Sequence, residues 1–140
     1  MPTWKLHAIL AMVFAGCTSV IAKKGLAGIT GELALTLRTL IVFLLIGTYA
    51  LIALPAKAYT TLRPENYLWL GLSALTTAAS WLYYYKALEK GDVTTIALID
   101  KGSILIAILL ATLFLGETIT PRLATGALLI LSGILLIAKK

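Results

Sequence analysis

The chain has 140 residues, of which 60% are hydrophobic and only 13% are charged, with a net charge of +6. Soluble domains carry about 25% charged residues, so this composition excludes a water-soluble globular domain and indicates an integral membrane protein. The basic residues lie in short segments between apolar blocks and at the C-terminus, without a basic stripe interleaved with aromatics, which excludes nucleic-acid binding. The single cysteine, Cys17, excludes an intramolecular disulfide and a cysteine-based metal cluster.

The apolar residues form five blocks, each close to the roughly 20 residues that cross a bilayer as a helix. In chain order, the predicted spans are approximately residues 4–22, 32–54, 67–88, 94–116 and 121–138. These blocks lack the length and alternation of membrane β-strands. The sequence therefore predicts an all-α membrane protein, a bundle of five transmembrane helices that forms a single domain over residues 1–140.

Helix-end signals mark several of these boundaries. Pro55 ends the second span, and either Asp92 or Thr94 can cap the fourth. Thr120 places a capping hydroxyl before Pro121, a residue that suits the first turn of the fifth span. The loops are short, so we expect neighbouring helices to run antiparallel.

The second span carries an arginine inside the apolar region. Arg38 lies six residues after the start of its span, and Asp100 lies six residues after the start of the fourth. Successive spans cross in opposite directions, so the second and fourth begin at the same face, and a rise of about 1.5 Å per residue places both charges at a similar depth. Arg38 is therefore the predicted partner for Asp100.

The third span contains a polar stripe. Its members recur at three- and four-residue spacing and so share one helix face: Ser73, Thr76, Thr77, Ser80 and Tyr84. This face either lines a water-filled cavity or makes hydrogen bonds to neighbouring helices and to its own carbonyls. Trp81 lies deeper than the interfacial aromatics and is a second candidate for lining a cavity.

The fourth span holds an acidic and a basic residue side by side. Charges within hydrocarbon are costly, so Asp100 and Lys101 are paired, hydrated or used in function. Adjacent residues point about 100° apart on a helix, so we expect each to find its partner elsewhere, with Lys101 extending toward the headgroups. Three hypotheses for Asp100 stay open: a static ion pair with Arg38 that locks two helices, a substrate or proton site, and a gate that closes a cavity.

Positive charge gives only a weak orientation signal. An odd number of spans places the termini on opposite sides of the membrane. The N-terminal face carries Lys5, Lys57, Arg63 and Arg122, and the opposite face carries Lys23, Lys24, Lys86, Lys90, Lys139 and Lys140. This bias slightly favours a cytoplasmic C-terminal face and leaves a mixture of both orientations open.

Several motifs occur together in order along nearly the whole chain. They are Trp4, Ala15-Gly16, Lys23-Lys24-Gly25-Leu26, Ala34 to Thr39 with Arg38, Tyr83 to Asp92, Ile99-Asp100-Lys101, Leu113 to Glu117, Thr120-Pro121 and Gly126. In this order and spacing the chain resembles a single EamA-type repeat of the drug/metabolite transporter superfamily, in its short five-helix bacterial and archaeal group. Arg38, Asp100 and Lys101 fall on positions typical of that family, whereas Gly102 stands where we expect leucine.

The resemblance implies a function. Family members of double length resemble two such repeats inserted in opposite orientations around a central cavity, and they move small metabolites or drugs. A single repeat then implies a homodimer, in a parallel or antiparallel arrangement, with alternating access in the cell (inner) membrane of a prokaryote. The partners would be the lipid bilayer and a small-molecule substrate.

The sequence therefore predicts a membrane transporter. It contains no nucleophile and base pair, no metal-ligand spacing and no glycine-rich phosphate loop, so we expect neither an enzyme nor a bound cofactor or metal. Two alternatives stay open: a non-transporting membrane scaffold or regulatory subunit, and a translocase of lipid-linked intermediates. The candidate substrate or coupling residues are Arg38, Asp100, Lys101, Trp81, Tyr84, Ser80 and Thr77.

Overall fold

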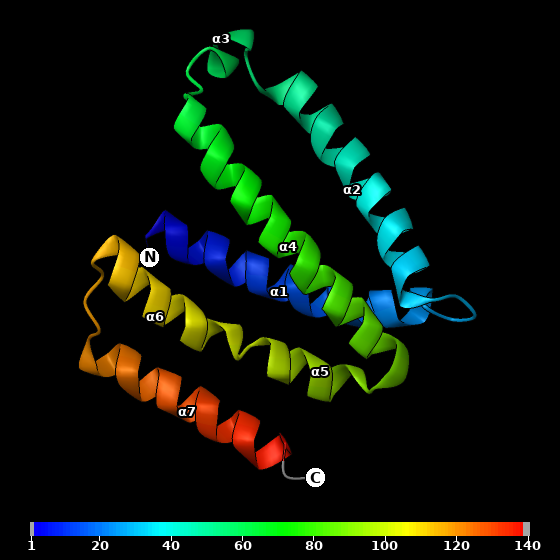
Figure 1. Cartoon of the computed structure of the whole chain (residues 1–140), viewed down its shortest axis with the longest axis vertical. Coiled ribbons are helices and arrows are strands. Elements are labelled where there is room, and N and C mark those ends of the chain that lie inside the picture. Colours follow the sequence, from blue (N-terminus) through cyan, green and yellow to red (C-terminus); the bar gives the residue numbers. More distant parts are fainter. Residues whose placement is uncertain (1, 139–140) are drawn as a thin grey trace. The chain divides into compact units, whose positions relative to one another are not determined.

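A computed structural model describes residues 2–138, with side chains up to residue 137. These residues form seven helices and no strand (Figure 1). The helices are α1 (Thr3–Gly25), α2 (Gly31–Ala53), α3 (Ala56–Tyr59), α4 (Pro64–Lys90), α5 (Val93–Asp100), α6 (Ser103–Leu115) and α7 (Pro121–Ala138). Lys139 and Lys140, which enter the predicted charge bias, lie outside the described residues.

The predicted all-α membrane protein is confirmed. Within the described residues, α1, α2 and the stretch Val93–Leu115 are each long and apolar enough to cross a membrane, and Pro121–Ile137 is a shorter apolar helix. The surfaces of these helices expose large apolar side chains, as lipid-facing helices do: Phe43 is 71% exposed, Leu51 85% and Phe114 80%. Every predicted span overlaps a helix, although a count of five membrane crossings stays a prediction.

The predicted helix ends are also present. A carboxylate oxygen of Asp92 accepts a hydrogen bond from the Thr95 backbone N–H at 2.9 Å, which makes Asp92 the N-cap of α5. The Thr120 hydroxyl oxygen accepts from the Leu123 N–H at 3.3 Å at the start of α7. Helix α2 ends at Ala53, two residues before Pro55, which instead precedes the short α3. These three ends follow from local sequence alone.

The Asp92 cap predicts a local dependence on pH. Hydrogen bonds donated first by Thr95 and then by Thr94 lower the pKa of Asp92 from 3.8 to about 2. A lowered pKa in the folded state means that the cap stabilises α5 fully above about pH 4 and loses this effect as the pH falls toward 2. We expect hydrogen exchange at the Thr95 amide, corrected for intrinsic rates, to lose protection over that range. An Asp92→Asn variant, whose cap cannot titrate, should show no such change, and a loss in both proteins would contradict the prediction.

The chain divides into two compact units, which are described separately. One comprises the residues up to Val20 together with those from Gly91 onward, and the other is Ile21–Lys90. The second unit contains the end of α1, then α2, α3 and α4. The first contains most of α1 and the helices α5, α6 and α7.

In the unit Ile21–Lys90, α2 and α4 approach most closely at the start of α2 and diverge toward α3 (Figure 1). A glycine makes this approach possible, because a Cβ at Gly31 would lie only 2.7 Å from the carbonyl oxygen of Tyr85. The buried apolar residues of the unit lie around this end of the helices: Leu26, Tyr85 and Leu88. The unit is therefore held together at one end and opens along the two helices.

In the other unit, α7 packs along both α5 and α6. The predicted span 94–116 matches the apolar stretch Val93–Leu115, but its helix is interrupted at Lys101 and Gly102. At the interruption the backbone makes hydrogen bonds between residues three apart, as in a 3₁₀ turn. The Gly102 N–H donates to the Ile99 carbonyl, and the Leu105 N–H donates to the Gly102 carbonyl. A side chain at residue 102 would also be crowded, since its Cβ would lie 2.9 Å from the Ile99 oxygen and 3.3 Å from a side-chain carbon of Ile134.

Candidate substrate site

A hollow of about 450 Å³ lies between the diverging parts of α2 and α4. It is lined by Leu35, Thr39, Leu70, Ser73, Ala74, Thr77, Ala78 and Trp81. We call this space the α2–α4 hollow. Its walls combine small and apolar side chains with three hydroxyls and one indole, a lining typical of sites that bind small molecules.

An arginine stands beside this hollow. The guanidinium carbon of Arg38 lies 4.5 Å from the centre of the Trp81 ring, in a cation–π contact. Arg38 shares one helix face with Leu35 and Thr39, which both line the hollow. Within the unit Ile21–Lys90, the half-buried Arg38 forms no ion pair with a carboxylate. Its charge is therefore held by an aromatic face at the edge of the hollow.

The polar stripe of α4 shows features of both predicted roles, lining a cavity and bonding to its own carbonyls. The hydroxyls of Thr76 and Thr77 both donate to the Ser73 carbonyl, at 2.9 and 2.8 Å, as expected for bonds to the helix's own backbone. Ser73 and Thr77 nevertheless also line the hollow, whereas Ser80 and Tyr84 are not among its lining residues. Tyr84 instead makes an edge contact with the ring of Tyr85.

Polar contacts join α4 to α2, and to the end of α1, where these helices meet. Glu32 and Lys86 form an ion pair at 3.0 Å, and the Gly31 backbone N–H donates to a carboxylate oxygen of Glu89 at 2.8 Å. The Lys23 ammonium donates to the backbone carbonyl of Leu88. Sequence reasoning missed these contacts, because none of them follows from local spacing. These contacts engage Glu32, Lys86 and Glu89 with partners other than Arg38.

The structure corrects the expected geometry of Asp100 and Lys101. The Lys101 ammonium lies 3.6 Å from a carboxylate oxygen of Asp100, so the two neighbours do contact each other. The expectation that each must find its partner elsewhere assumed an uninterrupted helix, whereas here the helix ends at Asp100 and Lys101 follows it as a turn residue. The predicted pair between Asp100 and Arg38 joins residues of different units and stays a prediction.

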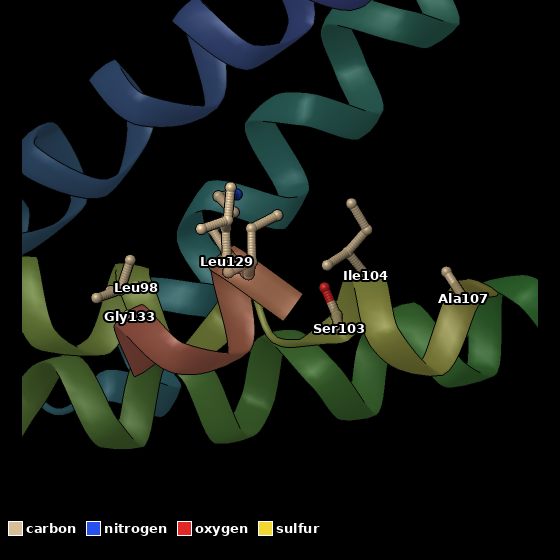
Figure 2. Close-up of a pocket in the computed structure, with 8 residues that line it drawn as sticks. Leu98, Ser103, Ile104, Ala107, Leu129 and Gly133 are labelled. Atoms are coloured by element: carbon tan, nitrogen blue, oxygen red, sulfur yellow. The ribbon is translucent and has the colours of Figure 1, made fainter. Parts of the chain in front are cut away.

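Lys101 also borders a second hollow, of about 550 Å³, between α7 and the two halves of the interrupted helix. It is lined by Leu98, Lys101, Ser103, Ile104, Ala107, Leu129, Ile130 and Gly133. In Figure 2, Ser103, Ile104 and Ala107 project from α6 toward the same side as Leu129 of α7. We call this space the α5–α7 hollow. Apart from Lys101 and the Ser103 hydroxyl its lining side chains are apolar, as is usual for a surface that contacts acyl chains or another helix.

Comparison with known proteins agrees with this arrangement of apolar helices and embedded charges. The model of the EamA-like transporter family matches residues 2–139. The chain belongs to the EamA-like transporter family. It is also 35% identical over 136 residues to a Sinorhizobium protein described as "Uncharacterized transporter in cobO 3'region", an overlap of 97% of this chain and 96% of that protein. No solved structure matches the chain.

Membership of the EamA-like family identifies the chain as a multi-pass membrane transporter. Within residues 2–137, no group of His, Cys, Asp and Glu side chains is arranged to hold a metal ion. Five of the seven candidate residues form two sets. Arg38, Thr77 and Trp81 meet at the α2–α4 hollow, and Asp100 and Lys101 meet at the interruption between α5 and α6.

Proposed function

We propose that this EamA-like protein transports small metabolites or drugs and that the α2–α4 hollow is its substrate site. The observation that supports this most directly is the arginine held against Trp81 at the edge of a hollow between two long helices, of which α2 is apolar enough to cross a membrane. An embedded charge of this kind is costly in a membrane and usually marks a substrate or ion pathway. Thr39, Ser73 and Thr77 add hydroxyl groups that orient a bound molecule.

The interruption between α5 and α6 is proposed as the coupling element. Asp100 is expected to bind and release a cation or proton during transport, while Lys101 is its alternative partner at 3.6 Å. Interrupted membrane helices supply such sites in several transporter folds, since the break leaves polar groups inside the membrane. A static structural role for Asp100 is the competing hypothesis.

The assembly is proposed to be a homodimer of one-domain chains, residues 1–140, in the inner membrane of a prokaryote. A single repeat supplies half of the helices found in double-length members, so a second copy would complete the cavity and allow alternating access. The antiparallel form agrees with the weak charge bias, because it requires copies in both orientations. We expect no enzymatic activity and no nucleic-acid partner.

Reporter fusions to both termini test the assembly. Paired reporters that are active on opposite sides of the membrane should each give signal at each terminus if the dimer is antiparallel. Signal on a single side at each terminus would exclude the antiparallel dimer and leave a parallel one. Crosslinking of the full chain in membranes provides the second measurement, because a species that remains monomeric at every crosslinker concentration would contradict both dimers and favour a subunit of another complex.

A further inference from the structure

The α2–α4 hollow also indicates what kind of molecule it binds. We propose that its ligand is an organic anion, with a carboxylate, sulfonate or phosphate group at Arg38 and a compact apolar or aromatic body against Trp81. This inference rests on the proposed function, since it assigns a substrate class to the same site. It does not depend on the dimer or on the role of Asp100.

The geometry of Arg38 favours an anionic group. The contact with Trp81 is a cation–π contact of the guanidinium carbon, 4.5 Å from the ring centre, and a guanidinium carries five N–H donors in its own plane, at its edge. That edge suits a carboxylate, sulfonate or phosphate, which can accept two parallel hydrogen bonds. Within the unit Ile21–Lys90, Arg38 forms no ion pair that would compete for this edge.

The other charges of the two helices do not oppose an anion. Glu32 is paired with Lys86, and Glu89 accepts a hydrogen bond from the Gly31 N–H. Glu65 lies in the first turn of α4 and is exposed, where the positive end of the helix dipole offsets its charge. No carboxylate lines the hollow. Among the charges of α2 and α4, that of Arg38 is therefore positive and not balanced by a carboxylate at the edge of the site.

The remaining lining residues indicate the polarity and size of the rest of the ligand. The Thr77 hydroxyl directs its hydrogen to the Ser73 carbonyl, so it offers lone pairs rather than a donor to the space. Leu35, Ala74 and Ala78 make apolar walls, and the Trp81 ring offers a flat surface for stacking. A space of about 450 Å³ lies toward the small end of known ligand sites and suits a compact soluble molecule better than a two-chain lipid.

A charge series tests the proposal. The full chain in nanodiscs of neutral phosphatidylcholine is titrated by calorimetry with benzenesulfonate, benzenesulfonamide and benzyltrimethylammonium, which share a ring but are negative, neutral and positive. We expect saturable binding of the anion only. Loss of one charge-assisted contact corresponds to about 10- to 100-fold in affinity, so Arg38→Gln should weaken binding by that factor and Arg38→Lys by less. Trp81→Ala should weaken it as well, and Trp81→Phe should retain most of it.

Arg63→Gln is the matched control, because it removes the same charge from an exposed position before α4 in the same unit. Chromatographic profile and helicity, measured for every variant, separate lost affinity from lost folding, and Arg38→Lys keeps the test informative if Arg38→Gln misfolds. Preference for the cation, equal loss in Arg63→Gln, or no saturable binding of any probe would overturn the proposal. If phosphatidylglycerol, added to the nanodiscs as a bulk lipid component, competes with benzenesulfonate for the site, the ligand is a lipid headgroup and the proposal is overturned. If the anion binds but is not taken up into vesicles, the transport role of this site fails while the ligand class stands.

Discussion

Replacing Gly31 with alanine is expected to destabilise the protein by about 1 to 3 kcal/mol, the usual cost of overpacking. The new Cβ would lie 2.7 Å from the backbone oxygen of Tyr85, 2.9 Å from its carbonyl carbon and 3.2 Å from a carboxylate oxygen of Glu89. The first two atoms belong to the backbone of α4 and cannot rotate away. The two helices must therefore separate, and the bond from the Gly31 N–H to Glu89 is expected to lengthen or break.

Gly47→Ala is the matched control on the same helix. Nothing lies within 4 Å of a Cβ at Gly47, so alanine should stabilise α2 by up to about 1 kcal/mol through its better helix propensity. Unfolding of the purified protein by increasing SDS in mixed micelles measures both variants. Opposite signs for the two substitutions confirm the close approach of α2 to α4, and equal effects would contradict it.

Replacing Asp100 with asparagine is expected to abolish transport that is driven by an ion or pH gradient, with a loss of about 100-fold or more if the carboxylate is the coupling group. Asparagine keeps the size of the side chain but cannot exchange a proton or carry charge. Uptake of benzenesulfonate into proteoliposomes under an imposed pH gradient measures the effect. Binding of the same probe to the α2–α4 hollow should be retained, because Asp100 is not among the residues that line it.

The alternative for Asp100 predicts a different pattern. If the Asp100 carboxylate has only a structural role, the Asp100→Asn variant should be less stable or assemble differently. Its uptake per folded protein should be unchanged. Glu117→Gln is the control for charge, since Glu117 is an exposed carboxylate just after α6 and is assigned no coupling role. Equal loss of uptake in both variants would indicate a general effect of net charge rather than a coupling site.

Much of the fold could be predicted from the sequence. Apolar blocks of spanning length fix the positions of the helices, because a buried backbone in lipid must satisfy its own hydrogen bonds. The ends at Asp92, Thr120 and Pro55 are set by residues within one turn, so short motifs identify them. The membrane class and the family follow from the same blocks together with the ordered motifs.

The interruption of the fourth span was harder to predict. Gly102 marks its position, but a single glycine inside a helical pattern costs only about 1 kcal/mol and is often tolerated. The broken geometry leaves no room for a side chain at residue 102, because a Cβ there would meet the Ile99 carbonyl and Ile134 of α7, and the second of these contacts is tertiary. The contact between Lys101 and Asp100 follows from the break and so could not be predicted without it.

Some residues of the proposed substrate site could be selected from the sequence. Arg38, Trp81 and Thr77 were recognisable because charged, aromatic and hydroxyl side chains are unusual inside apolar spans. That Arg38 stacks on Trp81 depends on how α2 and α4 lie against each other, which in turn depends on Gly31. A glycine at the start of a helix is common, and no local pattern distinguishes this one from Gly47.

The hydrogen bond from Lys23 to Leu88 has a consequence for how the chain matures. Leu88 is fully buried, so water cannot reach its carbonyl in place of the ammonium group. The last turn of α4 is thus completed by a residue at the end of α1 that was synthesised 65 positions earlier. The last turn of α4 is therefore complete only when the end of α1 lies against it, and we expect these two helix ends to become ordered together during biogenesis.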